Sequence, residues 1–173
     1  MACMGGIKNM KKTFFTLLAI VSIIFSSCNK DTENKSDYDI ITYDKVVFEK
    51  MISALDNCDK EQLESLFSSK SLAKTLDIDQ KIDDMMKLYK GNFISNNEFD
   101  YGTKSSSREN GKYVYYDVNA IVKGLKTTDF MYELNFGTTV VNNKDPKDVG
   151  LWRIWLKQID ENGHIIAECR IGE

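Results

Sequence analysis

The feature that most limits the fold of this chain is a change in the spacing of its apolar residues at Gly91. Before Gly91 the apolar residues recur every three or four positions, which is the period of a helix with one buried face. After Gly91 they alternate with polar residues, which is the period of a strand in a sheet with one buried face. The sequence therefore predicts helices first and an antiparallel sheet second.

Three amphipathic helices are predicted before Gly91. The first covers 38–56, where the apolar residues at helical spacing are Tyr43, Val46, Val47, Phe48, Met51, Ile52 and Leu55. The second begins after Asp59, because the sequence Asp-Lys-Glu-Gln that starts there resembles a capping box, and Leu63, Leu66 and Phe67 follow on one face. The third begins after Asp77, where a similar signal recurs, and it ends before Gly91, a residue type that commonly terminates helices.

Five strands are predicted after Gly91, over the segments 98–106, 112–123, 128–140, 151–159 and 165–171. Two Asn-Gly pairs, at Asn110 and Asn162, indicate β-hairpins because both residue types tolerate positive φ. The residues expected on the core face are Val114, Tyr116, Val118, Ala120, Val122, Phe130, Tyr132, Leu134, Phe136, Trp152, Ile154, Leu156, Ile165, Ala167, Cys169 and Ile171. The simplest fold is α+β, with the N-terminal helices packed on one face of a curved antiparallel sheet of about five strands.

The first 27 residues have the pattern of an export signal. Three lysines precede an uncharged apolar run of 13 residues at 13–25, which is shorter than the roughly 20 residues of a membrane span. The following Ser-Ser-Cys, ending at Cys28, resembles the bacterial lipobox, in which the chain is cut before the cysteine and acyl chains such as palmitate are attached. Phe25 departs from the Leu or Val usual in that motif, and an uncleaved signal anchor is the alternative. If translation starts at Met10 and not at Met1, the chain keeps the same export signal.

The sequence predicts three parts: a lipoprotein signal peptide at 1–27, a flexible polar tether at 28–37 and a single domain at 38–173. We expect the protein at the cell membrane or envelope, outside the cytoplasm, held by lipid on Cys28. Three of the 23 basic residues and none of the 26 acidic residues precede Cys28, so the processed chain carries a net charge of about −6. Binding to nucleic acid is not expected, because it needs clustered Lys and Arg.

Two short motifs resemble those of a known family. They are the segment 57–63 with the nearby Leu66 and Phe67, and the segment 150–154 late in the chain. Over about 43–171 the chain resembles a family of small bacterial lipoproteins known only as a domain of unknown function (5104). The order of helices followed by a curved sheet also resembles the nuclear-transport-factor-2-like, or cystatin-like, cone. The resemblance implies this fold and an envelope location but no activity, because the fold carries enzymes, ligand binders and dimerisation modules alike.

The residue types that usually carry catalysis or bind metals are few. The only histidine, His164, lies in a predicted hairpin turn, and the expected core face is almost wholly apolar, which argues against acid–base catalysis. The acidic residues Asp77, Asp79, Asp83 and Asp84 lack the spacing of a calcium loop and fit helix-capping charges better. We therefore predict no enzymatic activity, no cofactor and no metal. Cys58 and Cys169 are either joined by a disulfide or remain separate thiols.

Two candidate sites remain. Aromatic and basic residues that alternate away from the expected core face, namely Tyr113, Tyr115, Arg153 and Trp155, would form a binding face of the composition that interfaces favour. Residues expected toward the interior of the cone, namely Met86, Tyr116, Tyr132 and Trp152, would line a ligand pocket.

The leading functional prediction is a non-enzymatic lipoprotein whose domain binds an envelope protein or a second copy of itself through the sheet. The alternative is a small-ligand binder that uses the cone pocket, and an enzyme is third. A filled cone would favour the first function, and an open pocket of roughly several hundred Å³ would favour the second. A buried carboxylate beside a tyrosine in that pocket would favour an enzyme. The sequence leaves the partner, the membrane and the oligomeric state open.

Overall fold

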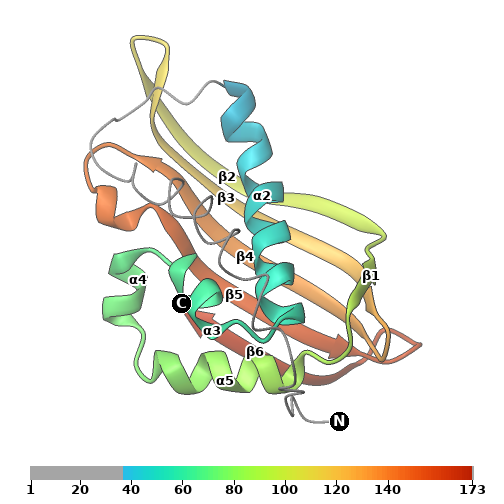
Figure 1. Cartoon of the computed structure of the whole chain (residues 1–173). Coiled ribbons are helices and arrows are strands. Elements are labelled where there is room, and N and C mark those ends of the chain that lie inside the picture. Colours follow the sequence, from blue (N-terminus) through green and yellow to red (C-terminus); the bar gives the residue numbers. More distant parts are fainter. Residues whose placement is uncertain (1–36, 173) are drawn as a thin grey trace, which may run out of the picture. The chain divides into compact units, whose positions relative to one another are not determined.

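The computed structural model describes residues 37–172 and confirms the α+β order. The helices are α2 (Asp37–Asp56), α3 (Lys60–Ser65), α4 (Ser69–Lys74) and α5 (Ile78–Leu88). The strands are β1 (Phe93–Ser95), β2 (Glu98–Glu109), β3 (Lys112–Thr127), β4 (Met131–Asn142), β5 (Gly150–Ile159) and β6 (Ile165–Gly172), with a 3₁₀ turn η2 (Pro146–Asp148) before β5. Figure 1 shows α2 crossing the sheet and α5 running along the β6 edge. None of the helices within 37–172 is long and apolar enough to cross a membrane.

The strands form one curved, open, antiparallel sheet in the order β1-β3-β4-β5-β6. Strands β1 and β2 share one edge, because β2 pairs with most of β3 and β1 pairs with its last residues. Strand β6 forms the other edge. The sheet has six strands where about five were predicted, because the three-residue β1 is too short to show an alternating pattern.

The hydrophobic core lies between the helices and one face of the sheet, which we call the inner face. The helices contribute Met51, Leu55, Leu63, Ile82 and Met85, and the sheet contributes Val122, Tyr132, Leu134, Phe136, Ile154 and Leu156. Burying each large apolar side chain contributes about 1.5–3 kcal/mol, so this layer supplies the main driving force for folding. Most of the predicted inner residues of 112–136 are confirmed as buried, namely Tyr116, Val118, Ala120, Val122, Tyr132, Leu134 and Phe136. The prediction is wrong for Val114, which is only partly buried because the β2–β3 register skips it, and for Phe130 and Ile165, which are exposed.

The helix starts follow the sequence signals in part. The amide of Gln62 donates to the Asp59 carboxylate at 2.9 Å, which confirms the predicted cap of α3. Asp77 precedes α5 but has φ +55° and makes no capping hydrogen bond, so the capping box predicted there is wrong. Helix α4 was not predicted because it carries few apolar residues, and the Ser68 side chain caps it by accepting from the amide of Ser71.

Both predicted hairpins are present. Asn110 and Gly111 have φ values of +52° and +79°, as the β2–β3 turn requires. In the β5–β6 turn only Gly163 has positive φ, and the Asp160 carboxylate accepts from the amides of Asn162 and His164 at 2.9 and 2.8 Å. The Asp160 side chain therefore organises the second turn in place of a left-handed asparagine.

Tyr132 ties the end of α5 to the sheet. Its hydroxyl donates to the carbonyl of Leu88 at 3.0 Å and accepts from the amide of Lys90 at 2.9 Å. Its fully buried ring stacks on that of Tyr89, with centroids 5.4 Å apart. The chain turns from helix to strand at this point, so one hydroxyl satisfies backbone groups that the helix end leaves without helical partners.

We expect Tyr132→Phe to lower the free energy of unfolding by about 1–3 kcal/mol, because the Leu88 carbonyl and the Lys90 amide would lose the partner that a fully buried side chain provides. Urea denaturation measures this change. Tyr113→Phe is the matched control, since the Tyr113 hydroxyl forms no hydrogen bond within the described residues and its loss should cost under about 0.5 kcal/mol. Equal effects of the two variants would contradict the assigned role of the Tyr132 hydroxyl.

Candidate functional site

The outer face of the sheet, opposite the helices, carries the candidate site. Side chains alternate between faces along a strand, so residues paired across strands share a face. Three outer-face rows cross the sheet: Asn119–Gly137–Arg153, Asn135–Trp155–Arg170 and Glu133–Lys157–Glu168. These rows bring together two of the predicted face residues, Arg153 and Trp155. The rows also contain acidic and amide side chains that were not predicted from the sequence as site residues.

Trp152 lies on the outer face, so its predicted place in the cone is wrong. The β4–β5 register shifts between Gly137 and Thr138, which leaves Trp152 as the extra residue of a bulge. Leu151 fills the inner position and is fully buried, while the Trp152 indole lies against Gly137, where a Cβ would collide with its ring. The indole Nε1 donates to Asp117 Oδ1 at 2.9 Å. The bulge thus moves a large aromatic residue from the core to the site.

Asp117 is the half-buried carboxylate of this face. Its Oδ1 accepts from Trp152 and also from the Thr139 hydroxyl at 3.3 Å. Burial raises the pKa of the Asp117 carboxyl above its usual range, although both hydrogen bonds act in the opposite direction. Burial, with the negative charges of Asp117 and Asp148 nearby, also raises the pKa of Tyr115. Sequence analysis missed Asp117 because an acid at an outward strand position resembles an ordinary solvated residue.

Arg153 is a cation that Asn119 and the Trp152 ring hold on the same face. Its Nη2 donates to Asn119 Oδ1 at 3.1 Å, and its guanidinium lies 4.9 Å from the centroid of the Trp152 ring. Its Nε is buried and has no hydrogen-bond partner within the described residues. Burial, and then the nearby charge of Arg170, lower the pKa of Arg153, but a guanidinium stays protonated in proteins. The arrangement therefore holds a positive charge in a defined orientation.

Trp155 occupies the centre of the next row and is held by charged neighbours. Its Nε1 donates to Glu168 at 3.2 Å. The Lys157 ammonium lies 4.0 Å from its ring centroid and the Arg170 guanidinium 5.8 Å. Lys157 also pairs with Glu133 at 2.7 Å, which lowers the pKa of that carboxyl. Trp155 is partly exposed, so the result is an oriented aromatic ring with cations over its face.

Tyr113 departs from the predicted binding face. Its ring meets that of Tyr116 edge-on at 4.9 Å, in a cluster with Val118 and Val140 on the helix side of the sheet. The β2–β3 register shifts here, because Ser107 pairs with Tyr115 and Arg108 with Tyr113. This shift separates Tyr113 from Tyr115, and alternation alone could not reveal it.

The four residues predicted to line a cone pocket are not brought together. Tyr132 is sealed in the core, Tyr116 belongs to the separate cluster beside Val118, and Trp152 is on the other face. Met86 packs at the edge of the core from α5. The structure therefore gives no support to a shared pocket formed by these side chains.

The two cysteines 58 and 169 are not joined. Cys169 is a free thiol, so the alternative of a Cys58–Cys169 disulfide is wrong, and burial raises the pKa of this thiol.

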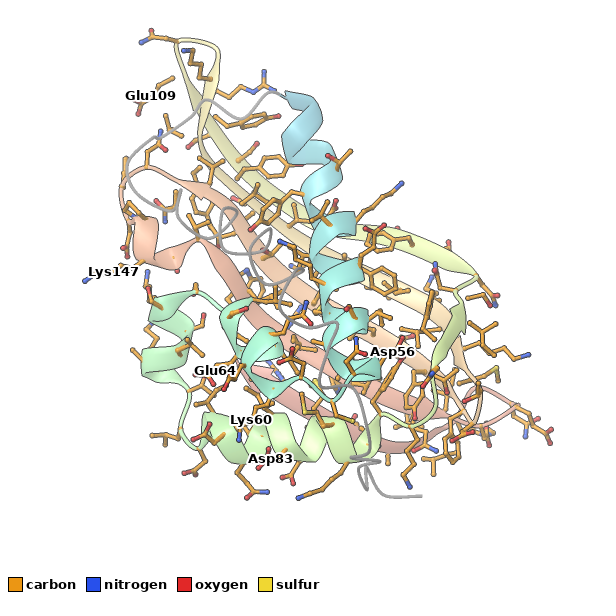
Figure 2. The ribbon with its side chains drawn as sticks, in the orientation of Figure 1. Asp56, Lys60, Glu64, Asp83, Glu109 and Lys147 are labelled. Atoms are coloured by element: carbon orange, nitrogen blue, oxygen red, sulfur yellow. The ribbon has the colours of Figure 1, made fainter. Side chains whose placement is uncertain are left out.

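The acidic residues and the histidine that the sequence analysis considered have structural partners. Figure 2 shows Lys60 and Asp83 pointing toward one another, and their ion pair measures 3.1 Å. Exposed His164 contacts Asp160 at 3.2 Å. Across residues 37–172, no group of three or more His, Cys, Asp or Glu residues has a geometry that could hold a metal ion.

We expect Gly137→Ala to displace the Trp152 ring and break its hydrogen bond to Asp117, lowering the free energy of unfolding by about 1–3 kcal/mol. Urea denaturation followed by tryptophan fluorescence measures both effects. In a Trp152→Ala background the same glycine substitution should cost much less, because the ring is gone. An unchanged cost in that background would show that Gly137 is needed for another reason.

Comparison with curated proteins gave no match. Comparison with protein families gave one, to the domain of unknown function DUF5104, over residues 50–161. The matched region runs from the middle of α2 to the end of β5, so it includes the Asp59 cap, the Trp152 bulge and most of the outer face. The chain belongs to the DUF5104 family.

Proposed function

We propose that this protein is a lipid-anchored extracytoplasmic interaction module, without enzymatic activity, that binds a protein partner through the outer face of its sheet. The observation that carries the proposal is the partly exposed Trp155 ring, which contacts Lys157 and Arg170 on the face of the sheet opposite the helix-covered core. Tryptophan and arginine are the residues that most often dominate binding energies at protein interfaces.

The hydrogen bonds on this face support the proposal because they fix its side chains before binding. Glu168 holds the Trp155 indole, Asn119 holds Arg153, and Glu133 holds Lys157. A side chain that is already ordered loses less conformational entropy on association, which would otherwise cost about 0.5–1.5 kcal/mol for each residue. The outer face thus has an oriented aromatic centre and a polar rim, which is the common anatomy of an interface.

The charges on the outer face indicate the kind of partner. Three cations, Arg153, Lys157 and Arg170, face two acids, Glu133 and Glu168, in a chain whose total charge is negative. A partner surface with an apolar centre and acidic groups around it would complement this face. An envelope protein and a second copy of the chain are the two candidate partners, and they differ in the mass of the complex that forms.

The location rests on the N-terminal sequence, which lies outside the described residues. We propose that the chain is cut before Cys28, that acyl chains are attached there and that residues up to 37 form the tether. We also infer that the curved sheet around α2 is of the nuclear-transport-factor-2-like, or cystatin-like, class. In such an arrangement a tethered domain would present its outer face to proteins near the membrane.

We expect Trp155→Ala to weaken self-association or partner capture at least tenfold while leaving the melting temperature nearly unchanged, because the ring is partly exposed and central to the face. Native mass spectrometry of the full chain, alone and with envelope extract, gives the mass and the fraction of each complex. Phe130→Ala is the control, since Phe130 is also an exposed aromatic residue but lies at the end of the sheet. If Trp155→Ala associates as the unchanged chain does, the outer face is not the binding surface.

We expect Cys28→Ala to abolish incorporation of radiolabelled fatty acid in the cell, because that thiol is the proposed acylation site. The labelled band is measured after gel electrophoresis of whole cells. Cys169→Ala should retain full labelling, since Cys169 is a thiol packed against the core. Labelling that persists in the Cys28 variant would rule out the anchor.

A further inference from the structure

A hollow of about 380 Å³ lies where α4, the start of α5 and the sheet meet. Trp152 and Gly172 line it from the sheet, and its charged lining residues are Lys70 and Lys74 from α4, Lys81 from α5 and one acid, Asp148. A second hollow on α4 is lined by Lys70, Lys74 and Lys147, the last of which Figure 2 shows beside that helix. The volume lies within the range of small-molecule sites, roughly 300–1,000 Å³.

The position of α4 beside Trp152 is fixed by backbone pairing. Leu151 donates its amide to the carbonyl of Leu66 at 2.8 Å, and its carbonyl accepts from the amide of Ser68 at 2.9 Å. This pairing requires a glycine at 150, where φ is +127° and a Cβ would lie 2.7 Å from the Ser68 amide nitrogen. The hollow is therefore a product of the main fold and does not depend on a loose surface loop.

The charges around the hollow are unbalanced. Lys70 pairs with Asp145 at 3.2 Å and with Asp148 at 3.4 Å, so its charge is compensated. Lys74 and Lys81 have no ion-pair partner in the part of the chain that the structure describes, and they line the hollow from two different helices, α4 and α5. Lys70 and Lys74 are four residues apart on one helix, which places both ammonium groups on one side. Two uncompensated cations thus converge on one space in a chain of negative total charge.

We propose that this hollow binds an anionic oxygen group, a phosphate or a carboxylate, carried by a small molecule or by a lipid headgroup. Lys74 of α4 and Lys81 of α5 would pair with the anion, and Trp152 would contact the rest of the ligand. Ammonium groups are well suited to this, because they bind oxyanions as point charges and adjust to different ligand shapes. The site is separate from the Trp155 centre of the outer face, so either can fail without the other.

The test uses the full chain in neutral detergent with the substitution Trp155→Phe, which leaves Trp152 as the single tryptophan of a chain that has two. Glucose 6-phosphate is titrated with glucose as the neutral match, and dihexanoyl phosphatidylglycerol with dihexanoyl phosphatidylcholine. We expect a saturable change in Trp152 fluorescence with at least one anionic probe and none with its neutral match. The affinity should fall as salt is added, because the attraction is electrostatic.

Two double variants decide the assignment. Lys74→Gln with Lys81→Gln should weaken binding at least tenfold. Lys50→Gln with Lys112→Gln removes the same charge from exposed lysines of α2 and β3 and should change it less than twofold. A response to glucose 6-phosphate alone identifies a soluble phosphorylated ligand, and a response to phosphatidylglycerol alone identifies a headgroup. No saturable response to either, or equal losses in the two double variants, would overturn the proposal.

Discussion

The pairing of β4 with its neighbours β3 and β5 is the constraint on which both faces of the sheet depend. On the inner side it aligns Val122, Leu134 and Leu156, which pack against the helices. On the outer side the same register aligns Asn119, Gly137 and Arg153. Because side chains alternate between the faces in the regularly paired stretches, the core cannot form in this register without also assembling the outer rows. Folding and site formation are therefore one event in this domain.

The period of the apolar residues was enough to predict the order of helices and strands, both hairpins and most of the inner face. The prediction failed wherever one extra residue in a strand reverses which side chains point to the inner face and which to the outer face. Trp152 and Tyr113 were each assigned to the wrong face, because the bulges beside them carry no marker in residue type. Helix α4 was missed for a different reason: it has too few apolar residues to show a helical period, and its position comes from a tertiary contact, the pairing of the preceding segment with Leu151.

The candidate site was predictable only in its residue types. Aromatic and basic residues at outward positions indicated a binding face, and Tyr115, Arg153 and Trp155 do lie there. What holds these side chains in place could not be predicted, because Asn119, Glu133 and Glu168 are ordinary polar residues until register sets them opposite their partners. The same holds for the hollow at α4, whose lysines are separated in sequence and converge through the fold.

The Asp117 carboxyl has a raised pKa and at the same time holds the Trp152 indole in place. Because burial raises the pKa of its carboxyl, the folded state holds the proton more tightly than the unfolded state between the usual value and the raised one. The contribution of Asp117 to the stability of the fold is therefore smaller at neutral pH, where its carboxyl is ionised, than at a lower pH, where the carboxyl is protonated. An uncharged residue could fill this position without that cost, but it would have to accept from the Trp152 indole and the Thr139 hydroxyl at once. Asp117 thus orients Trp152, a residue that belongs both to the outer face and to the lining of the α4 hollow. The Asp117 carboxylate therefore lowers stability at neutral pH while it fixes the orientation of the Trp152 ring.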